Sequence, residues 1–317
     1  MKQHIIKLIP KSFRPERLRS VADDFRLSCG QAAIQSNRCN QSKFKFLWDA
    51  EVKIFSQWGE DGILDYLCEL LEIVRPRIIE FGSGNFTECN SRYLAEARNA
   101  SVLAVDSRTD LSTSIKSMDV AWRSTVVARQ EWITPDTAPN AMAAARNEFG
   151  GLDIVSLDID GNDYWVAENL DLTGVRVVVV EYNSLWGSLR AVTVPRDDNF
   201  DRSAMHFSNV YYGASLKAFI RLFKSKKFTF LGTNRACNNA FFVHGPLPSR
   251  GIEPPDTTRD LGQFTDLRFR EARDESGRLT YSHPRKALEQ CRELPLWDLE
   301  SNALIKVSEI ESETHFG

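Results

Sequence analysis

Residues 77–84 read RIIEFGSG, a run of β-forming residues that leads into two glycines separated by one serine. A short apolar run followed directly by glycines is typical of a strand that enters a tight turn. Glycine lets the backbone bend sharply and approach a ligand, and the helix expected at about 91–97 offers free N–H groups at its start. Residues 77–84 therefore predict a strand, a turn and a helix, with a ligand at the turn.

Four more apolar strands follow, and helical stretches separate them. Near-continuous apolar strands indicate a sheet covered on both faces, as in a parallel sheet with helices on each side. The pattern therefore predicts a doubly wound α/β domain. The expected strands are 77–81, 101–106, 124–128, 153–160 and 175–181, and further helices are expected at 61–71 and 140–149.

The pattern changes after residue 181. A helix is expected at about 215–224, and two further strands, 228–233 and 239–244, leave no room between them for a crossover helix. Such strands must be antiparallel if they pair with each other. We expect an α/β fold with a mostly parallel seven-stranded sheet and a C-terminal antiparallel hairpin. This is the Rossmann-like plan of class I methyltransferases, whereas a dinucleotide dehydrogenase more often continues with a parallel sixth strand.

Composition restricts the class of protein. Of the 317 residues, 26% are charged and 42% hydrophobic, which indicates a soluble globular protein and excludes a collagen-like or membrane-embedded chain. The formal net charge of −3 gives no whole-chain attraction to nucleic acid, so no nucleic-acid partner is expected. The strong strand signals all lie in a central domain (56–246), which is flanked by an N-terminal extension (1–55) and a polar, charge-rich C-terminal extension (247–317).

The cysteines and the N-terminus bear on the compartment. The six cysteines show no C-x-x-C pair and no zinc-site spacing, so separate reduced thiols and a cytoplasmic protein are expected. An apolar run after Lys2 is interrupted by Lys7 and ended by Pro10, which makes it too short for a signal peptide. The alternative is a peripheral membrane association through the apolar side chains of residues 5–9.

Asp106 ends the second strand, 26 residues after Glu80. A carboxylate at this tip can accept hydrogen bonds from both hydroxyls of a ribose, which dinucleotide and adenosyl sites alike require. A dinucleotide fingerprint needs a third glycine shortly after Gly84, but residues 85–87 are Asn, Phe and Thr. The glycine turn and Asp106 together predict nucleoside binding, with pyrophosphate the weaker interpretation.

Polar side chains follow the fourth and fifth strands. Alternation on a strand places Asp158 and Asp160 on the same side, and Glu181 and Asn183 end the neighbouring strand. Two buried acids need a cation, hydrogen-bond donors or raised pKa values. Asp160, Glu181 and Asn183 offer the oxygen ligands that suit Mg²⁺. Alternatively, these groups bind the amino group of a ligand or cap loops.

Residues 184–212 form a long segment between the fifth strand and the next helix, where a lid or an acceptor pocket would lie. His206 is its only histidine, and a general base near neutral pH is most readily a histidine. The alternative is an ordinary surface histidine. Arg190 and Arg196 could bind an anionic acceptor, unless Asp197–Asp198 neutralises them.

Six motifs lie in the central domain: SQWGEDG (56–62), EFGSG (80–84), DIDGNDYW (158–165), EYN (181–183), YGASL (212–216) and NAFFV (239–243). In combination they resemble FkbM-like, class I S-adenosylmethionine-dependent methyltransferases over roughly residues 54–246. The resemblance implies methyl transfer to oxygen, often on a sugar or secondary metabolite, so the partner is a small-molecule or glycan acceptor. It also implies that the 56–62 segment folds over the cofactor site, with Gln57 or Glu60 touching cofactor or acceptor. The implied cofactor contacts are Glu80, Gly82, Gly84 and Asp106.

More distantly, the segments after the fourth and fifth strands are similar to metal-dependent macrocin-type sugar O-methyltransferases. That similarity implies a metal on Asp160 and Glu181, although Tyr182 stands where a second Asp is expected. A bound cation would lower the pKa of the acceptor hydroxyl. Without a cation, His206 or a carboxylate of Asp158, Asp160 or Asp163 must take the proton.

Two rivals remain open at this point. One is a non-catalytic adenosyl- or nucleotide-binding module whose extensions recruit a partner. The other is a nicotinamide oxidoreductase, for which the third glycine is missing. Neither the identity of the acceptor nor the oligomeric state follows from the sequence.

Overall fold

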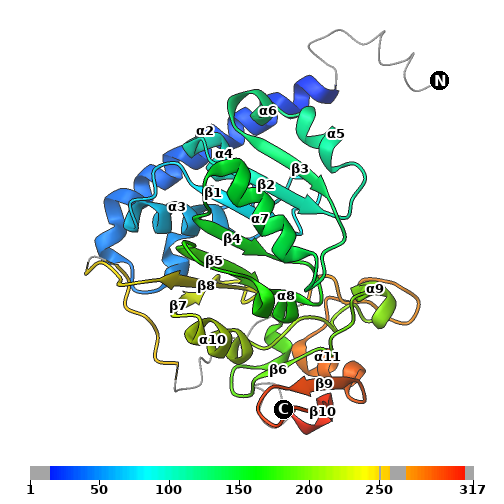
Figure 1. Cartoon of the computed structure of the whole chain (residues 1–317). Helices are drawn as coiled ribbons and strands as arrows, with labels where there is room; N and C mark the ends of the chain where they lie inside the picture. Colours follow the sequence, from blue (N-terminus) through cyan, green and yellow to red (C-terminus); the bar gives the residue numbers. More distant parts are fainter. Residues whose placement is uncertain (1–14, 250, 258–268, 311–317) are drawn as a thin grey trace, which may run out of the picture.

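A seven-stranded sheet forms the centre of the molecule (Figure 1). The computed structural model describes residues 15–249, 251–257 and 269–310. The strand order is β3-β2-β1-β4-β5-β8-β7. The strands are β1 (Arg77–Phe81), β2 (Ser101–Asp106), β3 (Val126–Gln130), β4 (Ile154–Leu157), β5 (Val177–Glu181), β7 (Phe228–Thr233) and β8 (Asn239–His244).

Strands β1 to β5 are mutually parallel, and β8 is antiparallel to both β5 and β7. The predicted seven-stranded sheet with its C-terminal hairpin is therefore confirmed. Several predicted strand boundaries differ by two residues or more, and β5 begins at Val177 rather than at 175. β3 begins two residues later than expected, and β4 ends at Leu157, so Asp158 and Asp160 lie in the following loop and strand alternation does not place them.

Helices cover both faces of the sheet, as predicted from the apolar strands (Figure 1). Ile79 and its neighbours pack with α7, α8 and α10, whereas Ile78 packs with α2 to α6, because successive strand residues point to opposite faces. The helices are α2 (Pro15–Asn40), α3 (Glu60–Leu70), α4 (Arg92–Arg98), α5 (Leu111–Lys116), α6 (Val120–Arg123), α7 (Ala138–Phe149), α8 (Asp163–Asn169), α9 (Arg202–Met205), α10 (Leu216–Ser225) and α11 (Pro284–Cys291).

Local sequence explains where α7 and α10 begin and end. In α7, Pro139 stands in the first turn and Gly150 adopts a left-handed φ of 71° at the end. In α10, the Ser215 hydroxyl accepts a hydrogen bond from the amide of Ala218, which satisfies a donor of the first turn. Both helices thus lie within two residues of their predicted bounds.

A second, three-stranded antiparallel sheet joins the segment after β5 to the C-terminal region. It consists of β6 (Val192–Thr193), β9 (Pro295–Asp298) and β10 (Ala303–Lys306). An ion pair of 2.7 Å between Arg190 and Asp298 adds to this contact. The two segments predicted as an insertion and a C-terminal extension therefore pack together beside the main sheet.

The described residues contain no helix that is long and apolar enough to cross a membrane. All six cysteines are free thiols, with Cys29 and Cys39 exposed and the other four buried. The prediction of separate thiols is confirmed.

Candidate functional site

A cavity of about 1340 Å³ opens at the carboxyl ends of β1, β2, β4 and β5. This is the edge at which open α/β sheets bind their ligands. Its volume exceeds the roughly 300–1,000 Å³ of an ordinary small-molecule site, which leaves room for two ligands. The predicted site residues that line it are Gln57, Glu80, Gly82, Gly84, Asp106, Asp158, Asp160 and Glu181.

The two glycines of the turn after β1 are favoured for different physical reasons. Gly82 has a φ of +81°, and a Cβ there would lie 1.5 Å from the carbonyl oxygen of Asp158. Gly84 has a φ of +58°, and a Cβ there would meet nothing within 4 Å. Gly82 therefore lets β1 pack against the loop after β4, whereas Gly84 leaves open space next to the cavity.

This difference gives a test with matched variants. Gly82→Ala is expected to lower the free energy of unfolding by about 3 kcal/mol, because the new methyl overlaps backbone. Gly84→Ala is expected to cost only about 1–2 kcal/mol of left-handed backbone strain, but to weaken by about tenfold the binding of the adenosyl ligand that the sequence predicts at this turn. Thermal unfolding and titration calorimetry measure both effects. Equal stability of the two variants would contradict this interpretation.

Glu80 organises the turn rather than facing the cavity with free oxygens. Its carboxylate accepts hydrogen bonds from the amides of Asn90 (2.7 Å) and Ser91 (3.0 Å) and from the Ser91 hydroxyl. Burial raises the pKa of Glu80, and these donors oppose that shift. Glu80 thus fixes the chain that leads into α4.

Asp106 lies at the tip of β2 and faces the glycine turn. One carboxylate oxygen accepts the amide of Gly84 at 2.7 Å, and the other accepts the amide of Arg108 at 2.9 Å. Each carboxylate oxygen can accept a second hydrogen bond. The side chain lines the cavity and is partly exposed, so these positions remain accessible to a ligand.

Three carboxylates meet on the opposite side of the cavity. Oxygen atoms of Asp158, Asp160 and Glu181 lie within 4.8 Å of one another. Burial, followed by the neighbouring acids, raises the pKa of Asp158 and of Glu181 well above the usual range. Glu181 is 7% exposed, and its Oε2 is buried without a hydrogen-bond partner. Glu181 thus contributes a buried oxygen without a hydrogen-bond partner to the acidic cluster.

The loop after β4 is held by its own acid. Asp163 accepts the amides of Ile159 (2.8 Å) and Gly161 (2.9 Å), and burial raises its pKa to about 6. Between them, Asp160 adopts a left-handed φ of 60°, which is uncommon for a residue other than glycine. This conformation brings the side chain of Asp160 to the cluster.

Arg202 supplies positive charge beside the acids, and the sequence alone did not single it out. Its guanidinium pairs with Asp160, lies 3.2 Å from Glu271, and stacks 3.9 Å from the ring centre of Tyr212. Its Nε donates to the carbonyl of Asn209 at 2.7 Å. The only signal in the sequence was an arginine in the segment after β5, which does not identify its partners.

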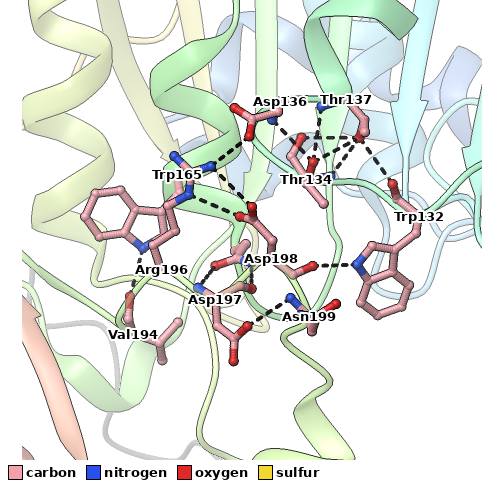
Figure 2. Close-up of polar contacts among 11 residues, drawn as sticks. Trp132, Thr134, Asp136, Thr137, Trp165, Val194, Arg196, Asp197, Asp198 and Asn199 are labelled. Carbon is pink, nitrogen blue, oxygen red and sulfur yellow. Dashed lines mark hydrogen bonds and ion pairs between the residues drawn. The ribbon is translucent and has the colours of Figure 1, made fainter.

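Hydrogen bonds and ion pairs anchor the chain just before Arg202 (Figure 2). The Trp132 indole donates to the carbonyl of Asp198 at 2.8 Å, and the Trp165 indole donates to the carbonyl of Val194 at 2.9 Å. Arg196 pairs with Asp198 and with Asp136. Arg196 is thus tied to acids, as the alternative interpretation held.

Two predicted site residues are not brought to the cavity. His206 is absent from the described cavity wall, and its Nδ1 lies 2.6 Å from the Ser208 hydroxyl. The Asn183 amide donates to the carbonyls of Val210 and Tyr212 and accepts from the amide of Leu185. The side chain of Asn183 is therefore used to hold the backbone. The third residue beside Asp160 and Glu181 is Asp158, not Asn183 as predicted.

The polar residues around the start of α3 have different roles. Gln57 lines the cavity. Glu60 is buried and accepts hydrogen bonds from the side chains of Asn234 (2.6 Å) and Asn239 (2.9 Å). Asp61 accepts three backbone amides of residues 54–56, and burial raises its pKa to about 7. Glu60 and Asp61 therefore shape this loop, whereas Gln57, like its neighbour Trp58, lines the cavity.

The C-terminal region contributes a wall that was not predicted. Arg270 lies 4.6 Å from the ring centre of Trp58. The cavity-lining residues of this region are Phe269, Arg270, Glu271, Arg273, Leu279 and Tyr281. The cavity is thus bounded by the turn after β1 on one side and by chain from beyond β8 on the other.

The sequence matches no protein-family model and no curated protein sequence. Among solved structures, similar chains include an O-methyltransferase family protein from Burkholderia thailandensis (TM-score 0.36, 14% identity, 58% of this chain and 55% of that one). Others are cofactor-bound Rv0187 from MTB (0.36, 16%, 72% and 96%) and human N-acetylserotonin methyltransferase in complex with SAM (0.33, 11%, 71% and 57%). The first of these matches spans little more than half of the other protein's length.

The strand order of this chain defines its class of fold. Five parallel strands in the order 3-2-1-4-5, followed by a hairpin whose last strand in the sequence is antiparallel to its neighbours, form the Rossmann-like fold of class I methyltransferases. The fold by itself fixes no reaction, so the reaction must be argued from the cavity.

Proposed function

We propose that this chain is an S-adenosylmethionine-dependent methyltransferase that acts on an oxygen atom. The observation that carries the proposal is the cavity wall formed by Gly84 and Asp106, where open space meets a carboxylate at the tip of β2. The free acceptor positions of Asp106 suit the two hydroxyls of the donor's ribose. The remaining volume, bounded by residues 184–212 and 269–281, suits a second molecule.

The residues of the cavity supply positioning and a proton acceptor. The sulfonium carries an activated methyl group, so the protein must chiefly align donor and acceptor and exclude water. Asp158 directly follows β4 and Glu181 ends β5, the next strand of the sheet, and their raised pKa values suit a carboxylate that takes the acceptor's proton. Arg202 holds Asp160 in place. His206 is not used in this proposal, because it does not line the cavity.

A divalent cation is the second candidate cofactor. Asp158, Asp160 and Glu181 form an all-oxygen donor set, and the unpartnered Oε2 of Glu181 fits Mg²⁺. When bound there, the ion would lower the pKa of the acceptor hydroxyl. Arg202 already pairs with Asp160 and competes for that position. Dialysis against a chelator, followed by added Mg²⁺, tests this: we expect unchanged turnover, and loss with recovery would assign the cluster to a metal.

Three further features of this proposal are the family, the class of acceptor and the compartment. The combination of motifs supports an FkbM-like enzyme, and the aromatic and charged cavity wall, with Trp132, Arg270 and Tyr281, suits a glycan or secondary-metabolite hydroxyl. Six free thiols suit a reducing compartment such as the cytoplasm.

Titration calorimetry tests the donor. We expect S-adenosylmethionine and S-adenosylhomocysteine to bind and NAD not to bind, because the turn lacks the third glycine of the dinucleotide site. Tight binding of NAD alone would remove the methyltransferase proposal. Transfer of a labelled methyl group from the donor to a component of host-cell extract distinguishes an enzyme from a non-catalytic adenosyl-binding module.

A further inference from the structure

Five arginines among the described residues line the cavity, and they differ in their partners. Arg108 pairs with Asp110 at 2.9 Å, and Arg202 pairs with Asp160, so the protein itself neutralises these two charges. A guanidinium group without a close carboxylate is available to bind the anion of a ligand. The three other arginines are Arg235, Arg270 and Arg273.

Two of these three have no acid partner within the described part of the chain. Arg270 forms no ion pair there, and its guanidinium lies over the ring of Trp58, 4.6 Å from the ring centre. A guanidinium that stacks on a ring keeps its N–H groups available, because they lie in its own plane. Arg273 likewise pairs with no described acid, and it donates to the backbone carbonyl of Gly277 at 2.9 Å.

Arg270 lies in the half of the cavity that contains the three carboxylates. The next residue in the chain, Glu271, lies 3.2 Å from Arg202, which itself pairs with Asp160. The proposed ribose ligand Asp106 ends β2, whereas the carboxylates follow β4 and β5 on the other side of β1. Arg270 is therefore placed beside the methyl acceptor rather than beside the donor's ribose.

Trp58 leads to the same carboxylates by a second route. Its amide donates to one oxygen of Glu60 at 2.9 Å, and the other oxygen accepts the side chain of Asn239 at 2.9 Å. Asn239 lies directly opposite Glu181 in the pair of strands β5 and β8. Two separate sets of contacts thus connect the Trp58–Arg270 stack with the carboxylates of the proposed proton transfer.

The acids near the arginines leave this positive charge in place. Glu271 lies against Arg202, and Glu51 lies 3.8 Å from Arg235, so each has an arginine of its own. The remaining charge of the wall is that of Arg270 and its neighbour in the same turn, Arg273.

The carboxylates themselves oppose an anionic acceptor only weakly. Arg202 pairs with Asp160, and burial raises the pKa of Asp158 and of Glu181, so that this pair holds a proton to higher pH. The sulfonium of the proposed donor adds a further positive charge to the cavity.

Apolar surface lies beside the arginines on the same wall. Tyr281 is 57% and Leu279 49% exposed, and both line the cavity. Aromatic and apolar side chains pack against the ring of a bound molecule, while a few charged groups fix its orientation.

We infer that the methyl acceptor carries an anionic group, a phosphate or a carboxylate, that Arg270 and Arg273 bind while its reacting hydroxyl reaches Glu181. The inference rests on the proposed methyl transfer and specifies the class of its substrate. Phosphate and carboxylate share the relevant chemistry, because a guanidinium binds the oxygens of either through two parallel hydrogen bonds. Arg190 and Arg196, which the sequence suggested for this role, are both paired with acids.

The charge of the methylated product tests the inference. Host-cell extract receives the wild-type protein and S-adenosylmethionine with a labelled methyl group, and the label that depends on the protein is passed over an anion exchanger at pH 7. We expect the label to be retained and to elute with salt. Loss of retention after phosphatase treatment identifies a phosphate, and loss after carbodiimide coupling to an amine identifies a carboxylate.

Two other outcomes separate this inference from the proposed function. A labelled product that is neutral overturns the anionic acceptor but leaves the methyltransferase proposal standing. If S-adenosylhomocysteine does not bind and no label is transferred, the proposed function fails and the inference fails with it.

Arg270→Gln tests the assigned residue, with the retained fraction as substrate. We expect the KM for the acceptor to rise about tenfold and kcat to stay within about twofold, because Arg270 binds the acceptor without touching the reacting atoms. Arg270→Lys should recover part of the affinity, since it keeps the charge but not the planar fork. Arg278→Gln is the matched control, because Arg278 lies in the same region but not among the described cavity-lining residues, and its KM should equal that of wild type.

The carboxylate of the donor's own methionine half is the competing partner of Arg270. S-adenosylhomocysteine carries that carboxylate, so titration calorimetry with this ligand distinguishes the two. We expect Arg270→Gln to bind it as tightly as wild type. A tenfold loss of this affinity with an unchanged KM for the acceptor would assign Arg270 to the donor and overturn the inference.

Discussion

Asp106→Ala is expected to weaken the binding of S-adenosylhomocysteine by about 10³-fold, with the fold intact. In the proposed binding mode, the variant removes two hydrogen bonds from ribose hydroxyls to a carboxylate, each worth about 1.5–3 kcal/mol. It also releases the amides of Gly84 and Arg108, which Asp106 holds at 2.7 and 2.9 Å. Titration calorimetry measures the dissociation constant, and circular dichroism checks the fold.

Two variants make this prediction specific. Asp110→Ala removes an exposed acid of the same loop, which pairs with Arg108 and is not among the described cavity-lining residues, and should leave the affinity unchanged. Asp106→Asn keeps one acceptor oxygen and should lie between wild type and Asp106→Ala. If Asp106→Ala bound the ligand as tightly as wild type, the adenosine would have to lie elsewhere and the proposed function would lose its main support.

The sheet could be predicted because its signal is local. Strands such as Val177–Glu181 are apolar up to their last residue, and their spacing indicates parallel strands and a final hairpin. The same geometry explains why Asp106, Asp158 and Glu181 were found together, since parallel strands end at one edge of the sheet. A residue at the end of a parallel strand is therefore placed at the carboxyl edge of the sheet by the topology alone.

The remaining site residues depend on contacts between distant segments. Arg202 reaches Asp160 across 42 positions of the sequence, and Glu271 comes from beyond β8. No periodicity encodes such pairings. The prediction of Asn183 as a metal ligand was based on its residue type, because an amide oxygen can bind Mg²⁺. In the structure its amide group instead donates to the backbone carbonyls of Val210 and Tyr212. His206 was chosen for its ordinary pKa, and its position could not be read from that property.

Glu181→Gln is expected to reduce turnover by about 10²–10³-fold while S-adenosylhomocysteine affinity stays unchanged. Loss of a positioned proton acceptor costs about this much. In the wild type, burial and the neighbouring Asp158 raise the pKa of Glu181, so turnover should rise with pH as the pair loses its proton. The rate profile of Glu181→Gln should lose or shift that rise. Asp158→Asn should behave alike, because the two carboxyl groups titrate together.

The same variant should be more stable than wild type above neutral pH. A carboxyl group whose pKa is raised by folding binds its proton more tightly in the native state, so its contribution to stability is lost as pH rises from about 4 through the raised value. Glutamine removes that loss, because the buried Oε2 no longer becomes a charge without a partner. At pH 8 we expect a melting temperature higher by about 2–4 °C, with the difference disappearing near pH 4.

Glu271→Gln is the matched control for both effects. Glu271 also lies on the cavity wall and near Arg202, at 3.2 Å, but its side chain is 54% exposed. Its replacement should change turnover much less and should bring no pH-dependent gain in stability, because an exposed ion pair is worth little. If the Glu181→Gln protein kept full turnover, or became less stable at pH 8, Glu181 would not be the buried base that takes the proton from the methyl acceptor. If added Mg²⁺ raised the melting temperature of the wild type at pH 8 but not that of Glu181→Gln, this would instead indicate a metal on the three carboxylates.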